Sequence, residues 1–206
     1  MAPSPSVITY YFWTASDWAY LGHQRLVAMA AKHGVDIDYR PVDLPTIYAQ
    51  TGGILLGQRS QQRQDYRMAE LRRWKARLGD PIVLEPRFFP TDHHPSSRLV
   101  AAAKLAGLPV AELSYAVMRA MWVEDRDISD RAVLREVGAG LVPDIDALLA
   151  ASDRPDVQAE YARYTAEAPG DGVFGSPFYL YDGDILWGQD RLDFLEEALE
   201  RHSAGA

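Results

Sequence analysis

The chain has 206 residues, 48% of them hydrophobic and 24% charged, which is typical of one folded domain and argues against disorder or membrane spanning. With 21 basic and 29 acidic residues the formal net charge is -8, which disfavours nucleic acid or an anionic membrane as a partner. The absence of cysteine excludes disulfides, thiolate metal sites and a thiol nucleophile from the protein itself, so sulfur chemistry would require a ligand that carries the sulfur.

The first elements form a βαβ pattern. Residues 7–13 (VITYYFW) are β-branched and aromatic, as in a buried strand, and Ser16 follows as a plausible helix N-cap. Residues 18–32 have the apolar spacing of a helix that ends at Gly34. Residues 35–42 alternate as a second strand. The two strands should therefore be parallel, with a right-handed crossover.

The middle of the chain is helical and contains no obvious internal repeat. Glycine and proline separate its apolar segments, which places the helix ends. The predicted helices cover residues 59–78, 96–106, 110–122, 129–137, 145–150 and 156–168.

The last section begins at Pro177. Residues 178–181 and 185–187 should form a hairpin around an Asp-Gly turn, and residues 192–199 a final helix. The order βαβ, helical block, ββα is typical of an α/β thioredoxin-like fold with a helical insertion. This predicts a thioredoxin-like domain of residues 1–45 and 170–206, interrupted by an all-helical domain of residues 46–169.

The opening residues, MAPSPSVITYYFW, lack the basic start and uninterrupted apolar core of a signal peptide. No run in the sequence reaches the roughly 20 apolar residues of a membrane helix. A cytoplasmic location without a membrane partner is therefore expected.

Pro177 has two interpretations. A proline at the first position of a strand costs no needed hydrogen bond, and X-Pro bonds in folded proteins are cis only about 5% of the time. In the thioredoxin-like plan, however, this position holds a cis proline, and the residue before it faces the start of the first helix. Ser176 would then offer its backbone N–H and C=O to an extended peptide.

The start of the last helix adds a second candidate binding group, formed by Trp187, Gly188, Gln189 and Asp190. Backbone amides at a helix N-terminus favour a carboxylate, and Asp190 can accept hydrogen bonds from an ammonium group. Together they suit the zwitterionic head of an amino acid. The alternative is that Asp190 only caps the helix.

Several motifs together resemble a known family: YYFWTASDWAYLG, WVEDRDISDRAVL, VFGSP, the hairpin, and WGQDRLDFLEEAL. They are similar to the 2-hydroxychromene-2-carboxylate isomerases, which are related to kappa-class glutathione transferases and to DsbA-type oxidoreductases of the thioredoxin-like superfamily. The resemblance spans nearly the whole chain, with the motifs in the expected order. It implies that glutathione is the cofactor, with its cysteine at Ser176 and Pro177 and its γ-glutamyl head at residues 187–190.

The resemblance also implies a catalytic role for Ser16, because similar proteins place a serine of the first helix near the glutathione sulfur. A hydroxyl donor and the positive end of a helix both favour the thiolate. A hydrogen bond to a charged acceptor contributes about 1.5 to 3 kcal/mol, or roughly one to two pKa units. Ser16 can equally be an N-cap alone, and the two roles are compatible.

The chain departs from the family pattern near this serine. The family commonly has proline directly after it and a small hydroxyl residue two positions further, where this chain has Asp17 and Ala19. A carboxylate beside a thiolate opposes its ionisation.

The substrate side also departs from the family pattern. The isomerases use a lysine after the second strand and an asparagine before the long helix, with further polar or aromatic groups, to hold an aromatic acid. Near those places this chain has Tyr48, Gln58, Arg59 and Phe89. Only Arg59 carries a fixed positive charge, which leaves the substrate open.

Other polar patterns have plainer interpretations. Asp92, His93 and His94 lack the spacing of a helical metal site, so a solvated loop without metal is expected. His23 accompanies no nucleophile elbow, which argues against a hydrolase.

The helix over residues 59–78 carries many arginines interleaved with acidic residues, as on a solvated face. These arginines are Arg59, Arg63, Arg67, Arg72, Arg73 and Arg77.

Three functions remain. The first is a glutathione-dependent isomerase, in which a thiolate adds to an unsaturated aromatic-derived acid, rotation follows, and elimination returns free glutathione. The second is a kappa-like transferase that releases the conjugate. The third is a non-catalytic thiol- or peptide-binding module, which Asp17 and the missing lysine favour. Homodimers are common among similar proteins, so a homodimer is one expected state.

Overall fold

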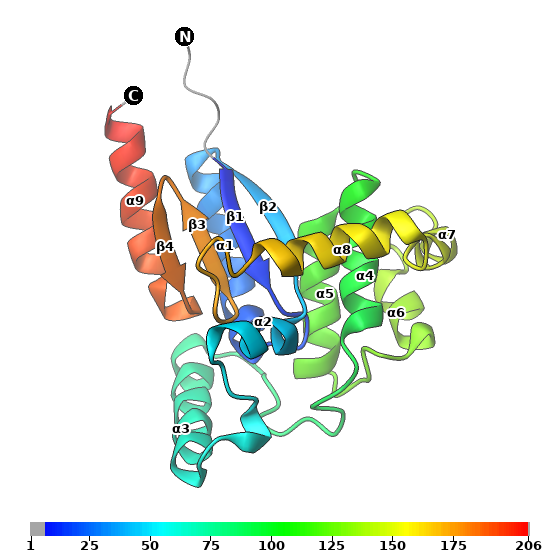
Figure 1. Ribbon diagram of the computed structural model, residues 1–206, viewed down its shortest axis with the longest axis horizontal. Helices are drawn as coiled ribbons and strands as arrows, with labels where there is room; N and C mark the ends of the chain where they lie inside the picture. Colours follow the sequence, from blue (N-terminus) through cyan, green and yellow to red (C-terminus); the bar gives the residue numbers. More distant parts are fainter. Residues whose placement is uncertain (1–6, 206) are drawn as a thin grey trace.

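The computed structural model describes residues 7–205, and a mixed four-stranded sheet lies at its centre (Figure 1). The strands are β1 (Val7–Phe12), β2 (Asp36–Pro41), β3 (Phe178–Tyr181) and β4 (Asp184–Trp187), in the order β2-β1-β3-β4. β1 pairs with β2 in parallel and with β3 antiparallel, and β3 and β4 form an antiparallel hairpin. The predicted thioredoxin-like α/β fold is confirmed.

Helices cover both faces of this sheet. Tyr10 and Phe12 of β1 belong to the large core that includes residues of α1 (Asp17–His33), α5 (Val110–Trp122) and α9 (Leu192–Gly205). Tyr11 points to the opposite face, where it packs in a smaller core with residues of α8 (Pro155–Glu167) and α2 (Leu44–Thr51). Successive side chains of a strand point to opposite faces, so this one aromatic run supplies both cores.

The predicted helices are confirmed, with ends that differ by one or two residues except at α9, which continues six residues beyond the predicted residue 199. The remaining helices are α3 (Gln61–Leu78), α4 (His94–Leu105), α6 (Arg131–Gly138) and α7 (Ile145–Ala151), with short 3-10 turns at Leu56–Gln58 and Gln189–Arg191. The sequence reasoning missed α2, which is short and carries Pro45 in its first turn.

Capping residues determine both ends of α1. Ser16 has an extended backbone, and its side chain accepts a hydrogen bond from the Ala19 amide at 3.1 Å, which satisfies one of the free amides of the first turn. Gly34 ends the helix at a φ of 64°, a left-handed conformation that glycine adopts without steric cost. The start of α1 is thereby fixed beside the carboxyl end of β1.

The large core continues from the sheet into the helices of the middle section. Ile8 of β1, Leu99 of α4 and Trp122 of α5 all belong to it. The division into a domain of residues 1–45 and 170–206 and a domain of residues 46–169 stays a prediction.

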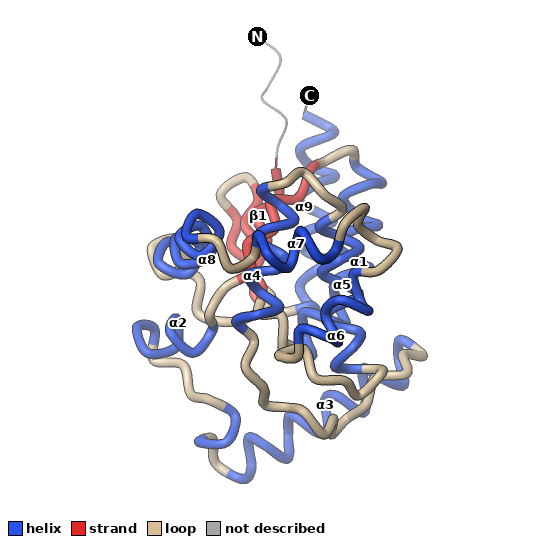
Figure 2. Tube along the Cα trace, turned by 90° about the vertical axis from the view of Figure 1, so that its right-hand side faces the viewer, coloured by secondary structure: helices blue, strands red, loops and turns tan. Residues whose placement is uncertain are grey.

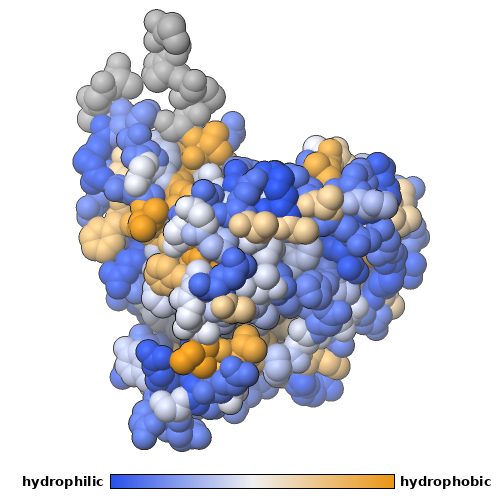
Figure 3. Space-filling view, viewed as in Figure 1, coloured by the Kyte–Doolittle hydropathy of each residue, from blue (hydrophilic) through white to orange (hydrophobic). Residues whose placement is uncertain are grey.

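α3 lies at the margin of the molecule, below α2 in Figure 1 and at the lower end of the trace in Figure 2. Its one fully buried side chain is Leu71. Figure 3 shows a largely hydrophilic face with small hydrophobic patches, one of them over the connection from α2 to α3, where Ile54 and Leu55 are exposed. No helix within the described residues is long and apolar enough to cross a membrane.

Candidate active site

Two serines that are 160 residues apart in sequence meet at the start of α1. The Ser176-Pro177 peptide bond is cis, as expected from the fold, and the Ser16 hydroxyl donates to the Ser176 carbonyl at 3.4 Å. The Ser176 hydroxyl in turn accepts from the Trp13 amide at 2.8 Å. Both serines are buried. The structure therefore places Ser16 beside the backbone on which the sequence interpretation depends.

The Ser16 hydroxyl combines the two roles that the sequence left open. Its oxygen accepts from the Ala19 amide at 3.1 Å, and its proton points toward the Ser176 carbonyl at 3.4 Å. The first distance is that of an ordinary hydrogen bond and the second is long. The proton is thus weakly held and is available to a stronger acceptor such as a thiolate.

A cavity of about 350 Å³ adjoins Ser176. Its wall includes most of the predicted binding residues, namely Tyr48, Arg59, Ser176, Trp187, Gly188, Gln189 and Asp190. Further wall residues come from α1, α3 and the 3-10 turn before α9: Trp18, Tyr66, Glu70, Trp74 and Arg191. The sequence left Trp74 open between core packing and the wall of an apolar pocket, and sequence reasoning missed the other four. Gln58 is exposed and lies outside this wall, as do Ser16, Pro177 and Phe89.

The turn before α9 is held in place more tightly than expected. The Gly188 amide donates to the Pro177 carbonyl at 2.9 Å, so it is not free for a ligand, contrary to the expectation for this helix start. Arg25 of α1 donates both to the backbone oxygen of Gln189 at 3.2 Å and to its side-chain oxygen at 3.0 Å. Gln189 therefore anchors this turn to α1.

Asp190 remains open to the cavity. Its carboxylate is partly exposed and lies 3.3 Å from the guanidinium of Arg191. Trp187 is half exposed and forms the neighbouring wall, with its ring 4.8 Å from that of Phe174 and its indole nitrogen over Gly175, where a Cβ would collide with it. This end of the cavity thus offers one carboxylate beside an aromatic wall.

On the substrate side, the structure brings Tyr48 and Arg59 together. Arg59 donates to the Tyr48 hydroxyl at 3.3 Å and to the Ile54 carbonyl at 2.8 Å. Burial raises the pKa of Tyr48, so its hydroxyl keeps its proton at neutral pH. Arg59 is thereby positioned at the cavity beside a neutral partner.

Phe89 lies elsewhere, in the wall of a second cavity of about 580 Å³ between α3 and the segment that follows it. The centre of its ring lies 6.1 Å from the ring centre of Trp13 and 5.1 Å from that of Trp122. The Phe89-Pro90 bond is also cis, which the sequence interpretation did not anticipate. Phe89 therefore connects the start of α1 with this second cavity.

Asp17 is buried and forms an ion pair with Arg67 of α3. Its carboxylate also accepts from the Trp18 amide at 2.8 Å. Burial raises the pKa of Asp17, and the charge of Arg67 acts in the opposite direction. The expectation of a solvated arginine face is wrong for Arg67, whose side chain is 12% exposed, but it fits Arg73 at 65%.

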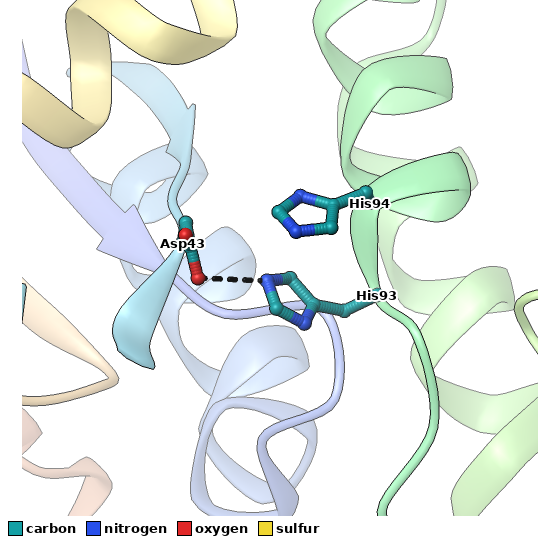
Figure 4. Close-up of side chains that lie close together, drawn as sticks. All are labelled: Asp43, His93 and His94. Atoms are coloured by element: carbon teal, nitrogen blue, oxygen red, sulfur yellow. Dashed lines mark hydrogen bonds and ion pairs between the residues drawn. The ribbon is translucent and has the colours of Figure 1, made fainter. Parts of the chain in front are cut away.

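The two adjacent histidines do not form a solvated loop, and that expectation was wrong. Figure 4 shows both side chains directed at Asp43, which precedes α2. His93 is buried and lies 3.2 Å from Asp43, while His94 lies 3.2 Å from the Tyr161 hydroxyl. Burial raises the pKa of Asp43, but hydrogen bonds from His93 and Thr46 outweigh it and lower the pKa to about 2.

The cluster therefore acts as a polar contact between the end of β2 and α4. Ligand atoms of Asp43, His93 and His94 all lie within 4.8 Å of one another, a spacing that a metal ion could also use. Their hydrogen bonds to one another and to Tyr161 already satisfy these groups from within the protein. The absence of a metal from the candidate site stays a prediction.

Comparison with known proteins gives the same fold and family. Residues 7–200 match the family described as "DSBA-like thioredoxin domain". The chain is 33% identical over 194 residues to 2-hydroxychromene-2-carboxylate isomerase of Sphingobium xenophagum, covering 93% of this chain and 97% of that protein. The isomerase of Pseudomonas putida is 27% identical over 213 residues, with 95% of each chain covered.

A solved structure of 2-hydroxychromene-2-carboxylate isomerase superposes with a TM-score of 0.80 at 25% identity, covering 96% of each chain. The match therefore extends over both the sheet and the helical section. The chain belongs to the DsbA-like thioredoxin-domain family and, within it, to the family of 2-hydroxychromene-2-carboxylate isomerases.

Proposed function

We propose that this protein is a glutathione-dependent isomerase of an unsaturated acid derived from an aromatic compound, such as 2-hydroxychromene-2-carboxylate. The names of its relatives support the reaction class and the substrate. One observation carries the mechanism: the Ser16 hydroxyl lies 3.4 Å from the backbone carbonyl of Ser176, the residue that precedes cis Pro177 and lines a cavity of about 350 Å³.

The residues present fit glutathione. The Ser176 backbone faces the start of α1, where a cysteinyl residue could pair with it as an added β-like rung. Asp190 supplies a carboxylate for the ammonium of the γ-glutamyl group, and Trp187 supplies an apolar wall. Because the chain contains no cysteine, glutathione would supply the thiolate that adds to the double bond and leaves after rotation.

The protein groups then have separate tasks. Ser16 would donate its proton to the sulfur, and the N-terminus of α1 would favour the negative charge there. Tyr48 and Arg59 would face the acid from α2 and from the turn before α3, with Arg59 attracting its carboxylate. The cavity wall from Trp18 and Trp74 would shield the reacting centre from water.

The experiment is an assay of 2-hydroxychromene-2-carboxylate isomerisation with and without glutathione, combined with a count of free thiol at the end. An isomerase requires glutathione and returns all of it, whereas a kappa-like transferase consumes thiol in proportion to product. Glutathione binding without turnover on this acid or other aromatic electrophiles would identify a binding module. Isomerisation at full rate without glutathione would contradict the proposal.

Location and assembly stay predictions beside this proposal. A cytoplasmic location would suit a glutathione-dependent enzyme, because the cytoplasm keeps thiols reduced. A homodimer and the absence of nucleic-acid or membrane partners are likewise expected.

A further inference from the structure

The buried ion pair between Asp17 and Arg67 lies directly beside Ser16. We propose that Arg67 is a positioning residue for the reaction: it neutralises the Asp17 carboxylate, so that a thiolate can form at the start of α1. This inference rests on the proposed glutathione-dependent function. It assigns a role to α3 that the arginine pattern of that helix did not indicate.

Asp17 on its own would oppose the thiolate. Its carboxylate is buried in the first turn of α1, where it accepts from the Trp18 amide at 2.8 Å and draws on the positive end of the helix. A thiolate held by Ser16 would use the same helix end. Two negative charges a few ångströms apart in a partly buried site disfavour each other by about one pKa unit or more.

Arg67 is held where it can cancel this charge. Its guanidinium pairs with Asp17, and the two side chains are 12% and 7% exposed, so water screens the pair only weakly. The guanidinium also lies 5.7 Å from the centre of the Phe89 ring, and one nitrogen lies 3.5 Å from the sulfur of Met68. The positive charge is thus fixed beside Asp17, the residue that follows Ser16, by contacts on several sides.

Other ionisable groups face the same region from different elements. Tyr48 of α2 lies near enough to Asp17 for the two to interact, and its hydroxyl contacts Arg59. The remaining charged wall residues of the smaller cavity are Glu70, Asp190 and Arg191. Arg67 itself lines the larger cavity, whose other charged wall residues are Asp65, Arg72 and Glu85. Among the charged residues of these walls, only Arg67 forms an ion pair with Asp17.

The packing of α3 against the rest of the protein does not depend on the Asp17–Arg67 ion pair alone. Leu71 buries its side chain in the large core, and Lys75 donates to the Ile82 carbonyl at 2.7 Å. Both contacts hold the helix in place without Arg67. A change in the charge pair can therefore alter the electrostatics at Ser16 while α3 stays docked.

The test measures the pKa of the thiol of bound glutathione, from the ultraviolet absorbance of the thiolate across pH, after calorimetry has established binding. Arg67→Gln should raise this pKa by about one unit or more, because Asp17 loses its partner. The double variant Asp17→Asn/Arg67→Gln removes both charges and should return the pKa to the wild-type value. Arg67→Lys keeps the charge and should stay close to wild type.

Arg63→Gln is the matched control, since Arg63 lies on the same helix, is exposed and lines neither of the two cavities. It should leave the thiol pKa unchanged. If Arg67→Gln does not fold, Asp17→Asn decides, because it removes the opposing charge while keeping Arg67 and should lower the thiol pKa below wild type.

The outcomes separate this inference from the proposed function. An unchanged thiol pKa in Arg67→Gln, or in Asp17→Asn if that variant decides, overturns the role of Arg67 while glutathione binding stands. A wild-type protein that binds no glutathione overturns the proposed function and this inference with it.

Discussion

Ser16 uses a single hydroxyl group for a structural bond and for the proposed chemistry. The oxygen caps α1 through the Ala19 amide, while the proton points to the Ser176 carbonyl over a longer distance. The geometry predicts different costs for the two roles, because loss of a helix cap affects stability and loss of a donor to a thiolate affects rate.

Ser16→Ala should therefore lower stability by about 1 kcal/mol and turnover by roughly 10- to 100-fold, through loss of a charge-assisted hydrogen bond. Urea unfolding and isomerase kinetics measure the two effects. Asp130→Ala is the control, since Asp130 caps α6 through the Ala132 amide at 2.8 Å. It should lose similar stability and no activity. Equal turnover in both variants would remove the assigned role of Ser16.

Gly188 has a backbone conformation and a close neighbour that leave no room for a larger residue. Its φ of 103° is one that other residues rarely adopt, and an added Cβ would lie 2.5 Å from a carboxylate oxygen of Asp190. Gly188→Ala should displace Asp190 and weaken glutathione binding, measured by calorimetry, by roughly tenfold.

Gly183→Ala is the matched control, because Gly183 also has a positive φ but an added Cβ there meets no atom within 4 Å. Both variants should lose stability through backbone strain. Only Gly188→Ala should lose affinity for glutathione. Equal affinity in the two variants would argue against Asp190 as a binding group.

At the scale of elements, local patterns were enough to predict most of the fold. The cap at Ser16, the Asp-Gly hairpin and the position of Pro177 depend on nearby residues, and all were predicted in place. α2 was missed because it is short and begins beside Pro45. The other features that the sequence did not predict are contacts between segments that are distant in sequence.

Two such contacts bury side chains that the sequence predicted to be solvated. Asp17 and Arg67 are 50 residues apart, as are Asp43 and His93, and nothing in either local pattern selects the partner. In the sequence, the buried arginine of α3 cannot be distinguished from the solvated arginines of the same helix, because all have the same residue type. Only the docking of α3 against the start of α1 distinguishes Arg67.

α3 carries an element-scale prediction. Leu71 is its one fully buried side chain, so Leu71→Ala should leave a cavity under this helix and cost about 2 to 5 kcal/mol for the packing of α3. Hydrogen exchange should show faster exchange for the amides of α3 than in wild type. Leu78→Ala, at an exposed position of the same helix, should leave exchange unchanged. Equal protection in the two variants would contradict the view of Leu71 as the anchor.

At the scale of the whole molecule, one buried histidine links stability to pH. Burial lowers the pKa of His23 from 6.5 to about 4, and a ring nitrogen lies 2.9 Å from the Ala111 carbonyl of α5. The folded state therefore keeps this ring neutral, while the unfolded state takes up a proton below its own pKa. The contribution of His23 to stability is fully present above pH 6.5 and is lost as pH falls toward about 4.

Unfolding by urea should show this loss. Between neutral pH and about pH 5 the contribution of His23 should fall by about 2 kcal/mol. His23→Gln keeps an amide donor for the Ala111 carbonyl without a titrating ring, and it should remove that part of the pH dependence. The same slope in wild type and variant over this range would contradict the assignment.

In the proposed complex, the sulfur of glutathione lies between the start of α1 and the strand that begins after Pro177. The most direct test is a crystal structure of the protein with glutathione. We predict the sulfur within hydrogen-bond distance of the Ser16 hydroxyl, the cysteinyl backbone paired with Ser176, and the γ-glutamyl ammonium at Asp190. Glutathione bound away from Ser16, or a sulfur that faces no group of α1, would contradict the account.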